Sequence, residues 1–196
     1  MRALIVRHAA SQGCAPRIVE STAEAFEMTA AFDYAFSINV MEHVDDVEQS
    51  IQRIAASLVP GGTYRFTCAN YLFPYEPHFN IPTLFSKRLT ERVMHAKIYG
   101  RRHIGDPAGL WKSLNWINVV ALRRIARRLP AATMSFDTEL LVTTPERTAT
   151  DAQFAARRSP LMRSVMLGLV RLRLHRLSAM APAAIQPIID CRVVRR

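Results

Sequence analysis

The clearest hydrophobic pattern of the chain lies between residues 32 and 68. Phe32–Ile38 is an aromatic and apolar run with the length of a strand, and apolar residues spaced three and four apart follow it, as on one face of a helix. Pro60-Gly61-Gly62 ends the helical pattern, and Thr63–Cys68 is a further strand. The helical positions are Val44, Val47, Ile51, Ile54 and Leu58. A strand, a helix and a strand in this order predict a βαβ unit with parallel strands.

Weaker patterns on both sides of this unit predict an α/β fold with a mostly parallel sheet and helices on its faces. A first helix is expected to end at Gly13 and Pro16. The polar stretch 146–160 marks a boundary between a region at 1–148 and a basic helical C-terminal extension at 149–196. The other predicted elements are strands at Arg17–Ser21 and Met134–Val142 and helices at Thr83–Lys97, Ser113–Leu129 and 160–180.

Small polar side chains stand where the two strands of the βαβ unit end. Ser37 and Asn39 close the first strand, and Asn70 follows the second. Open parallel sheets bind ligands outside the carboxyl ends of their strands, where small side chains leave room and offer hydrogen bonds. The same residue types also cap helices. The polar strand ends therefore predict either a ligand pocket or a helix cap.

The segment after the second strand, residues 70–82, is dense in prolines and aromatic residues. Pro74, Pro77 and Pro82 exclude a regular element, and long structured loops of this kind are often functional. Glu76 and His78 lie within this stiffened loop. Its aromatic residues are Tyr71, Phe73, Tyr75 and Phe79. They either clamp a flat or apolar substrate or form a small core under the loop.

The stretch FDYAFSINVMEHVDDVEQSIQRIAASLVPGGTYRFTCAN resembles the second half of a class I S-adenosylmethionine-dependent methyltransferase domain. Members of this family show a Phe-Asp strand, a polar strand end, a Glu-His-Val helix start and a Leu-x-Pro-Gly-Gly turn. These motifs correspond here to Phe32-Asp33, Ser37 to Asn39, Glu42-His43-Val44 and Leu58 to Gly62. The combination is fairly specific, and the resemblance covers residues 17–82 well and 83–145 loosely.

This resemblance implies a partial Rossmann-like methyltransferase sheet over residues 1–148 and S-adenosylmethionine as cofactor. It places the segment Val19–Phe26 near the adenine, with Thr22 where the family usually has aspartate. The cofactor-binding residues that it implies are Thr22, Ala23, Glu24, Ser37 and Asn39. In one subgroup the loop after the second strand lines the acceptor side. The implied substrate-binding residues are Asn70, Tyr71, Tyr75, Glu76 and Phe79.

The chain departs from the family pattern in its glycines. The family binds its cofactor through a glycine-rich turn after the first strand, but Gly13 stands alone and no such turn precedes Val19. By the family pattern, two strands and the helix between them are missing. The sequence therefore predicts a truncated product, a misplaced start or a fragment that needs a partner, and an isolated chain that is impaired.

Methyl transfer from a sulfonium is a direct displacement, in which the enzyme supplies closeness, alignment and, for some acceptors, a base. His43 at the expected pocket edge and His78 in the loop are the predicted catalytic residues. Alternatively, His43 orders the turn by hydrogen bonding to backbone, and Glu42 caps the helix. No metal is predicted, because Asn39 stands upstream of Glu42-His43 and a second carboxylate is not evident.

Positive charge is concentrated at the end of the chain. The 196 residues carry a net charge of +10, and residues 151–196 hold nine arginines and two aspartates. The arginines are Arg157, Arg158, Arg163, Arg171, Arg173, Arg176, Arg192, Arg195 and Arg196. The segment 160–180 combines arginines with an apolar face, so it can pack on the sheet, form a homodimer or lie on an anionic membrane surface. Few aromatic residues occur here to stack on bases, which argues against nucleic acid.

The remaining composition bounds the function. Three cysteines form no CxxC pair, so neither a cysteine zinc site nor a disulfide framework is expected. No segment reaches the roughly 20 apolar residues of a membrane span. We therefore expect a cytoplasmic protein, with peripheral contact at the inner membrane surface as a further option. The predicted function is methyl transfer from S-adenosylmethionine to a small-molecule or lipid-linked acceptor. The alternative is a non-catalytic α/β module that docks to a membrane or protein partner through its basic C-terminus.

Overall fold

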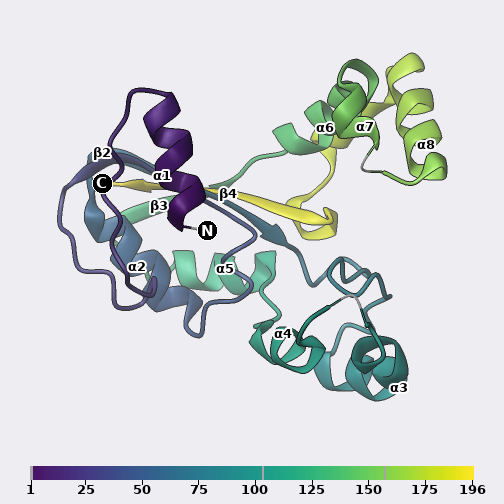
Figure 1. The fold of residues 1–196 in the computed structure, drawn as a ribbon, viewed down its shortest axis with the longest axis horizontal. Helices are drawn as coiled ribbons and strands as arrows, with labels where there is room; N and C mark the ends of the chain where they lie inside the picture. Colours follow the sequence, from purple (N-terminus) through teal and green to yellow (C-terminus); the bar gives the residue numbers. More distant parts are fainter. Residues whose placement is uncertain (1, 103, 157) are drawn as a thin grey trace.

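A computed structural model describes residues 2–102, 104–156 and 158–196, so that Arg157 lies outside the described residues. A four-stranded sheet in the order β1-β2-β4-β3 forms its centre (Figure 1). The strands are β1 (Phe32–Ile38), β2 (Leu58–Ala69), β3 (Ala132–Phe136) and β4 (Ile188–Arg195). β1 and β2 pair in parallel, whereas β4 runs antiparallel to both β2 and β3. Three strands thus share one direction, and the predicted α/β fold is confirmed.

The βαβ unit predicted from the sequence is present. Helix α2 (Val47–Ser57) connects β1 to β2. Phe32 pairs with Leu58 and Tyr34 with Thr63, so the intervening residues of β2 bulge out of the ladder. Gly61 has φ +80°, a left-handed conformation that side chains disfavour. A Cβ on Gly62 would lie 2.8 Å from the carbonyl oxygen of Val59. The two glycines are therefore required by the geometry of this turn.

One face of the sheet carries the hydrophobic core. Alternate residues of β2 and β4 point to this face, where α2 and helix α5 (Val119–Ala126) cover it. Buried side chains from the two strands are Tyr64, Phe66, Cys68, Ile189, Cys191 and Val193. Ile51 of α2 and Leu122 of α5 are fully buried in the same cluster. Each fully buried side chain of this size contributes about 1.5–3 kcal/mol to the free energy of unfolding.

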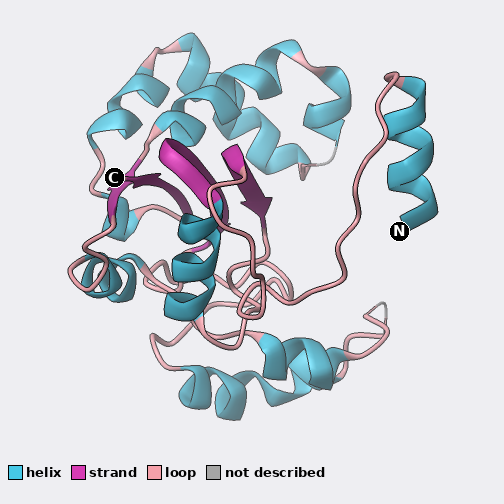
Figure 2. Ribbon diagram, turned by 90° about the vertical axis from the view of Figure 1, so that its left-hand side faces the viewer, coloured by secondary structure: helices cyan, strands magenta, loops and turns pink. Residues whose placement is uncertain are grey.

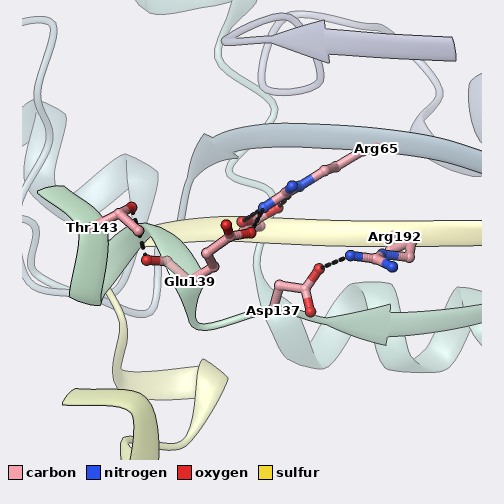
Figure 3. A network of polar contacts seen from close by, with 6 residues as sticks. Arg65, Asp137, Glu139, Thr143 and Arg192 are labelled. Carbon is pink, nitrogen blue, oxygen red and sulfur yellow. Dashed lines mark hydrogen bonds and ion pairs between the residues drawn. The ribbon is translucent and has the colours of Figure 1, made fainter. Parts of the chain in front are cut away.

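On the opposite face, β2 and β4 carry polar side chains that form ion pairs (Figure 3). Arg65 of β2 donates to both carboxylate oxygens of Asp190 in β4, at 2.9 and 2.7 Å, and to Glu139 at 2.9 Å. The Asp190 side chain is only 2% exposed, whereas the neighbouring pair of Arg192 and Asp137 is much more open to solvent. These carboxylates raise the pKa of Arg65 further above its ordinary value, with the hydrogen bonds to Asp190 as the largest cause.

The C-terminal region differs from the prediction in three places. Helices α6 (Glu139–Thr150), α7 (Ala152–Ala156) and α8 (Pro160–Arg171) lie together at one side of the sheet (Figure 1), so the second half of the predicted strand Met134–Val142 is wrong. The predicted helix 160–180 breaks at Arg173, which has φ +58°. The 3-10 helices Leu174–Met180 and Ala183–Ile185 follow. The extension expected to be helical then ends in β4, a central strand of the sheet.

The remaining helices are shorter than the sequence pattern suggested. Helix α1 (Arg2–Ser11) stands apart from the sheet in Figure 2, and its apolar residues Leu4, Ile5 and Val6 are exposed. The strand predicted at Arg17–Ser21 is wrong, because this segment belongs to an irregular connection. Helix α3 spans Lys87–Tyr99, and the helix predicted at Ser113–Leu129 is divided between α4 (Pro107–Ser113) and α5.

We expect the Arg65→Met variant to lose about 3–5 kcal/mol of unfolding free energy, because it leaves the buried Asp190 carboxylate without its main counter-charge. Methionine retains most of the aliphatic stem, so the loss reports on the charge. Urea unfolding followed by circular dichroism measures it.

The matched control is Arg192→Met, which removes an arginine from the same sheet face but breaks only the more exposed pair with Asp137. This variant should lose no more than about 1 kcal/mol. Equal losses in the two variants would contradict a special role for the pair of Arg65 and Asp190.

Candidate functional site

A pocket of about 380 Å³ opens at the sheet edge where β1 and β2 end and β4 begins. This is the place that the polar strand ends predicted. Its lining residues are Asn39, Glu42, Ala69, Tyr75, Pro77, His78, Pro187 and Ile188. They come from three segments of the chain: the turn after β1, the end of β2 with the loop that follows it, and the residues at the start of β4.

Asn39 turns the chain out of β1 and into the pocket wall. Its backbone N–H still donates to the Thr67 carbonyl at 2.8 Å, as in a parallel ladder. Its φ of +53° then lies in the left-handed region, which asparagine tolerates better than most residues. Residues held in such conformations are concentrated at functional sites.

Glu42 and His43 lie in the turn between β1 and α2, not at the helix start. α2 begins at Val47, and Asp46 is its N-cap, accepting a hydrogen bond from the Gln49 N–H at 2.9 Å. The prediction that Glu42-His43-Val44 opens the helix is therefore wrong, as is the alternative that Glu42 caps it. The apolar spacing of Val44 misled the prediction, because this residue is buried without being helical.

Asn115, between α4 and α5, holds this turn in place. Its amide nitrogen donates to the carbonyls of Met41 and Val44, both at 2.8 Å. Its backbone N–H donates to the Glu42 carbonyl at 2.9 Å, and its side-chain oxygen accepts from the Ile117 N–H. One residue thus binds three backbone groups of a turn that lies far away in the sequence. No local signal in the sequence indicates this role.

The loop 70–82 is organised around the fully buried carboxylate of Glu76. Its oxygens accept hydrogen bonds from the backbone N–H groups of His78 and Phe79 and from the Tyr71 hydroxyl. They also accept from Nδ1 of His78, at 2.6 Å. Glu76 and Ile81 form a β-bridge that closes the loop. The carboxylate therefore fixes both the loop backbone and the direction of the His78 ring.

The hydrogen bonds of the two site histidines determine which ring nitrogen is free. The Glu76 carboxylate can only accept, so Nδ1 of His78 carries a proton. In its neutral form His78 therefore presents an unprotonated Nε2. Nδ1 of His43 lies 2.9 Å from the Ser113 hydroxyl, which also contacts the Leu110 carbonyl at 2.9 Å. When the Ser113 hydrogen is donated to Leu110, Nδ1 of His43 donates to Ser113 and Nε2 of His43 is unprotonated as well.

Glu42 and the two histidines form one cluster. A carboxylate oxygen of Glu42 and one ring nitrogen each of His43 and His78 all lie within 4.8 Å of one another, and the rings are 5.2 Å apart. Burial raises the pKa of Glu42 above its ordinary value. Burial, with a smaller effect of His78, lowers the pKa of His43, whereas the hydrogen bond to Glu76 raises the pKa of His78.

Of the predicted cofactor residues, one lines the pocket and the others have partners or places elsewhere. Asn39 lines the pocket. Glu24 instead accepts hydrogen bonds from the backbone N–H groups of Asp45 and Asp46, which ties the segment 22–24 to the start of α2. The Ser37 hydroxyl bonds to the Tyr64 hydroxyl at 2.8 Å. Cofactor contacts of Thr22, Ala23, Glu24 and Ser37 therefore stay predictions, and the structure gives these residues other partners or places.

The predicted substrate residues divide in the same way. Tyr75 lines the pocket, but Tyr71 and Phe79 are buried: Tyr71 stacks on Trp116, and Phe79 meets Trp111 edge to face. Asn70 is also buried, and its amide nitrogen donates to the carbonyls of Ala183, Ala184 and Gln186. It anchors the segment that enters β4, so that its substrate contact, like that of Glu76, stays a prediction. Sequence reasoning missed four residues of the site: Ser113, Asn115, Pro187 and Ile188.

The chain is similar to known proteins in its sequence. Residues 1–66 match the family described as "Methyltransferase domain". Two uncharacterized proteins of Mycobacterium tuberculosis, one from each of two strains, are 46% identical over 181 residues, which is 92% of this chain and 62% of theirs. The chain thus spans less than two thirds of the length of these relatives.

Solved structures show the same fold. An S-adenosylmethionine-dependent methyltransferase from Mesorhizobium loti matches with a TM-score of 0.53 and 12% identity, over 100% of this chain and 77% of that one. The YcgJ protein from Bacillus subtilis matches with a TM-score of 0.50 and 13% identity, over 99% and 77%. The chain carries part of the fold of class I S-adenosylmethionine-dependent methyltransferases, as its motifs predicted.

Replacing Asn115 tests how far the turn depends on it. The Asn115→Ala variant leaves the carbonyls of Met41 and Val44 without their donor, so we expect a loss of about 1–3 kcal/mol in unfolding free energy. We also expect the imidazole NMR signals of His43 to shift, because the turn that carries His43 loses its clamp.

Asn118→Ala is the matched control, since it removes the N-cap of α5 three residues away. It should cost about 1 kcal/mol and leave the His43 signals in place. Unchanged His43 signals in both variants would contradict the proposed clamp.

Proposed function

We propose that this chain forms the acceptor side of a methyltransferase that transfers the methyl group of S-adenosylmethionine to a small-molecule or lipid-linked acceptor. The observation that carries the proposal is the pocket at the carboxyl ends of β1 and β2, in the fold of this enzyme class. Ligands of open α/β sheets bind at this edge. The match of residues 1–66 to the methyltransferase domain family supports the same function.

The pocket residues suit a displacement reaction. Such a reaction requires the acceptor atom and the methyl group to be held close and in line. Tyr75, Pro77 and Ile188 supply apolar surface to hold the acceptor. His78 in the lining presents an unprotonated nitrogen that can accept a hydrogen bond or a proton from an acceptor hydroxyl or amine, and the His43 ring lies beside it, outside the lining. We assign the cofactor to the β1 side of the pocket, next to Asn39 and the segment 22–24.

Calorimetry with S-adenosylmethionine and S-adenosylhomocysteine tests the proposal. We expect a micromolar dissociation constant, and about tenfold weaker binding by Asn39→Gly, which keeps the left-handed turn but removes the amide. Acceptors can be sought by transfer of a labelled methyl group to small-molecule and lipid alcohols and amines.

The control is Arg173→Gly. Arg173 has a similar left-handed backbone conformation but lies outside the pocket lining, so this variant removes similar backbone strain and should leave cofactor binding unchanged. Absence of heat at millimolar cofactor would contradict cofactor binding by this chain and would favour a non-catalytic interaction module.

We also propose that α8 and the turn after it lie on an anionic membrane surface. None of the described residues of α8 is buried, and Leu161, Met162 and Val165 are exposed. Arg163, Arg171, Arg173 and Arg176 accompany them. A basic amphipathic helix of this kind binds anionic bilayers through apolar contact and charge. None of the described helices is long and apolar enough to cross a membrane.

Co-sedimentation with vesicles tests this contact. We expect the chain to bind vesicles of phosphatidylglycerol but not of phosphatidylcholine, and to lose most of this binding in the double variant Leu161→Ser/Val165→Ser. The matched control is Leu89→Ser/Val93→Ser, because these residues are similarly exposed on α3. Equal losses in the two double variants, or equal binding to both vesicles, would contradict the proposal.

A further inference from the structure

We propose that Glu42, His43 and His78 bind a divalent transition metal ion at the wall of the pocket, and that Zn²⁺ is its best match. This inference does not depend on methyl transfer, because it rests on the arrangement of ligand atoms alone. The sequence predicted no metal, since a second carboxylate was not evident beside Glu42 and His43. The fold supplies the third ligand from the loop 70–82 instead.

The three ligand atoms are close enough to share one ion. They all lie within 4.8 Å of one another, and two of the three residues, Glu42 and His78, line the pocket. Bond lengths of about 2.0–2.2 Å place the ligands of tetrahedral zinc about 3.4 Å apart. Binding therefore has to draw the groups together by no more than about 1.4 Å, within the range of small side-chain rotations. Three protein ligands and an open position describe many catalytic zinc sites.

Hydrogen bonds hold both imidazoles in place beside Glu42. Glu76 accepts from Nδ1 of His78, so that Nε2 of this ring carries the free lone pair, and Ser113 holds Nδ1 of His43, which leaves Nε2 of that ring available when Nδ1 donates. A carboxylate that accepts from the second nitrogen of a ligating histidine is a recurring feature of zinc sites. It fixes the ring and makes the ligating nitrogen more basic.

Glu42 provides an independent observation that points to a ligand. The residue is 1% exposed, and its Oε2 has no hydrogen-bond partner among the described residues. A buried carboxylate oxygen without a partner is costly, unless a proton, water or cation satisfies it. Within the described part of the chain, the neighbouring Glu76 forms an ion pair with His78. When both histidines are neutral, as metal ligands are, the cluster holds the two negative charges of Glu42 and Glu76. A divalent cation would balance these two charges.

The ligand chemistry favours zinc over magnesium. Two imidazoles and one carboxylate suit zinc and related transition metals, whereas magnesium prefers six oxygen ligands in an octahedron. Because the pocket lies against Glu42 and His78, the open position of the ion would face the bound acceptor. With the ion bound, the histidine nitrogens would be ligands instead of proton acceptors, and the metal would lower the pKa of a coordinated hydroxyl and so make it a better nucleophile.

Calorimetric titration with ZnCl₂ tests the site on the metal-stripped chain without cofactor. Exposed Cys14 can bind zinc by itself, so all measurements use the Cys14→Ser background. We expect one ion per chain with a dissociation constant of about 1 µM or tighter, and no binding of MgCl₂. His78→Ala and Glu42→Gln should each weaken zinc binding at least tenfold, and Ser113→Ala about tenfold through the orientation of His43.

The matched control is His95→Ala, since His95 is an exposed histidine on α3, outside the pocket. It should bind zinc as the background chain does. Circular dichroism and the thermal midpoint without metal establish that each variant folds. Visible absorption of bound Co²⁺ gives a second readout, because its intensity reports a coordination number below six and should be lost in His78→Ala.

Two results would overturn the site: no zinc binding at 100-fold the expected dissociation constant, or binding that the folded His78→Ala and Glu42→Gln variants retain. Because the titration contains no S-adenosylmethionine, a failure here leaves the calorimetric test of the cofactor unaffected, and a failure of cofactor binding leaves the metal result unaffected.

Discussion

The pairing of β4 with β2 on one side and β3 on the other is the constraint on which the rest of the structure depends. β4 is the last strand of the chain, yet it occupies an interior position in the sheet. Its side chains complete the core on one face, and Asp190 anchors the polar face through Arg65. Pro187 and Ile188, where it begins, form one wall of the pocket. The pocket therefore exists only when β4 has paired with β2, which lies more than 100 residues earlier in the sequence. Pairing between such distant segments is slow to form.

The site depends on long-range contacts to the same degree. Glu42 and His43 lie in an irregular turn, and His78 lies in an irregular loop, yet each segment is held by partly buried hydrogen bonds. Asn115 binds the turn, and Glu76 fixes the loop from within. Irregular segments commonly carry function on a rigid scaffold. Here the rigidity comes from amide and carboxylate groups that satisfy backbone donors and acceptors, so side chains on separate segments can meet in one cluster.

The sequence predicts those parts of the fold that local patterns determine. The βαβ unit followed from apolar spacing and from Pro60-Gly61-Gly62, and the pocket edge followed from the polar residues that end the strands. β4 was missed, although Ile189, Cys191 and Val193 alternate with polar residues, because charged Asp190 and Arg192 lie between them. Asp190 and Arg192 fit a central strand because Arg65 and Asp137 form ion pairs with them, and the sequence does not reveal these partners. The strand predicted through Val142 was wrong because short apolar runs have no period that separates strand from helix.

The site could be predicted only in part for a related reason. His43, His78, Asn39 and Tyr75 were found because they follow strands or sit in an unusual loop. Which aromatic residues of that loop face the pocket is decided by packing partners that lie outside it, such as Trp111 and Trp116. Ser113 and Asn115 carry no local signal at all. Their roles arise from hydrogen bonds to a turn about 70 residues away.

The two sides of the pocket differ in how far other parts of the chain cover them, and strand β1 is the exposed side. Among the described strands β1 pairs with β2 alone, and Tyr34, Phe36 and Ile38 are 56%, 69% and 64% exposed. Strands of parallel sheets are normally covered on both faces, and an apolar strand with a free edge invites pairing with a further strand. A second copy of the chain, as predicted from the sequence, is one candidate to cover it.

The wall formed by the loop 70–82, Pro187 and Ile188 needs no such cover, since its residues are held by contacts within the chain. Because Asn39 stands at the end of β1, whatever covers this strand also extends the side of the pocket to which we assign the cofactor, while the opposite wall is already formed by residues of this chain.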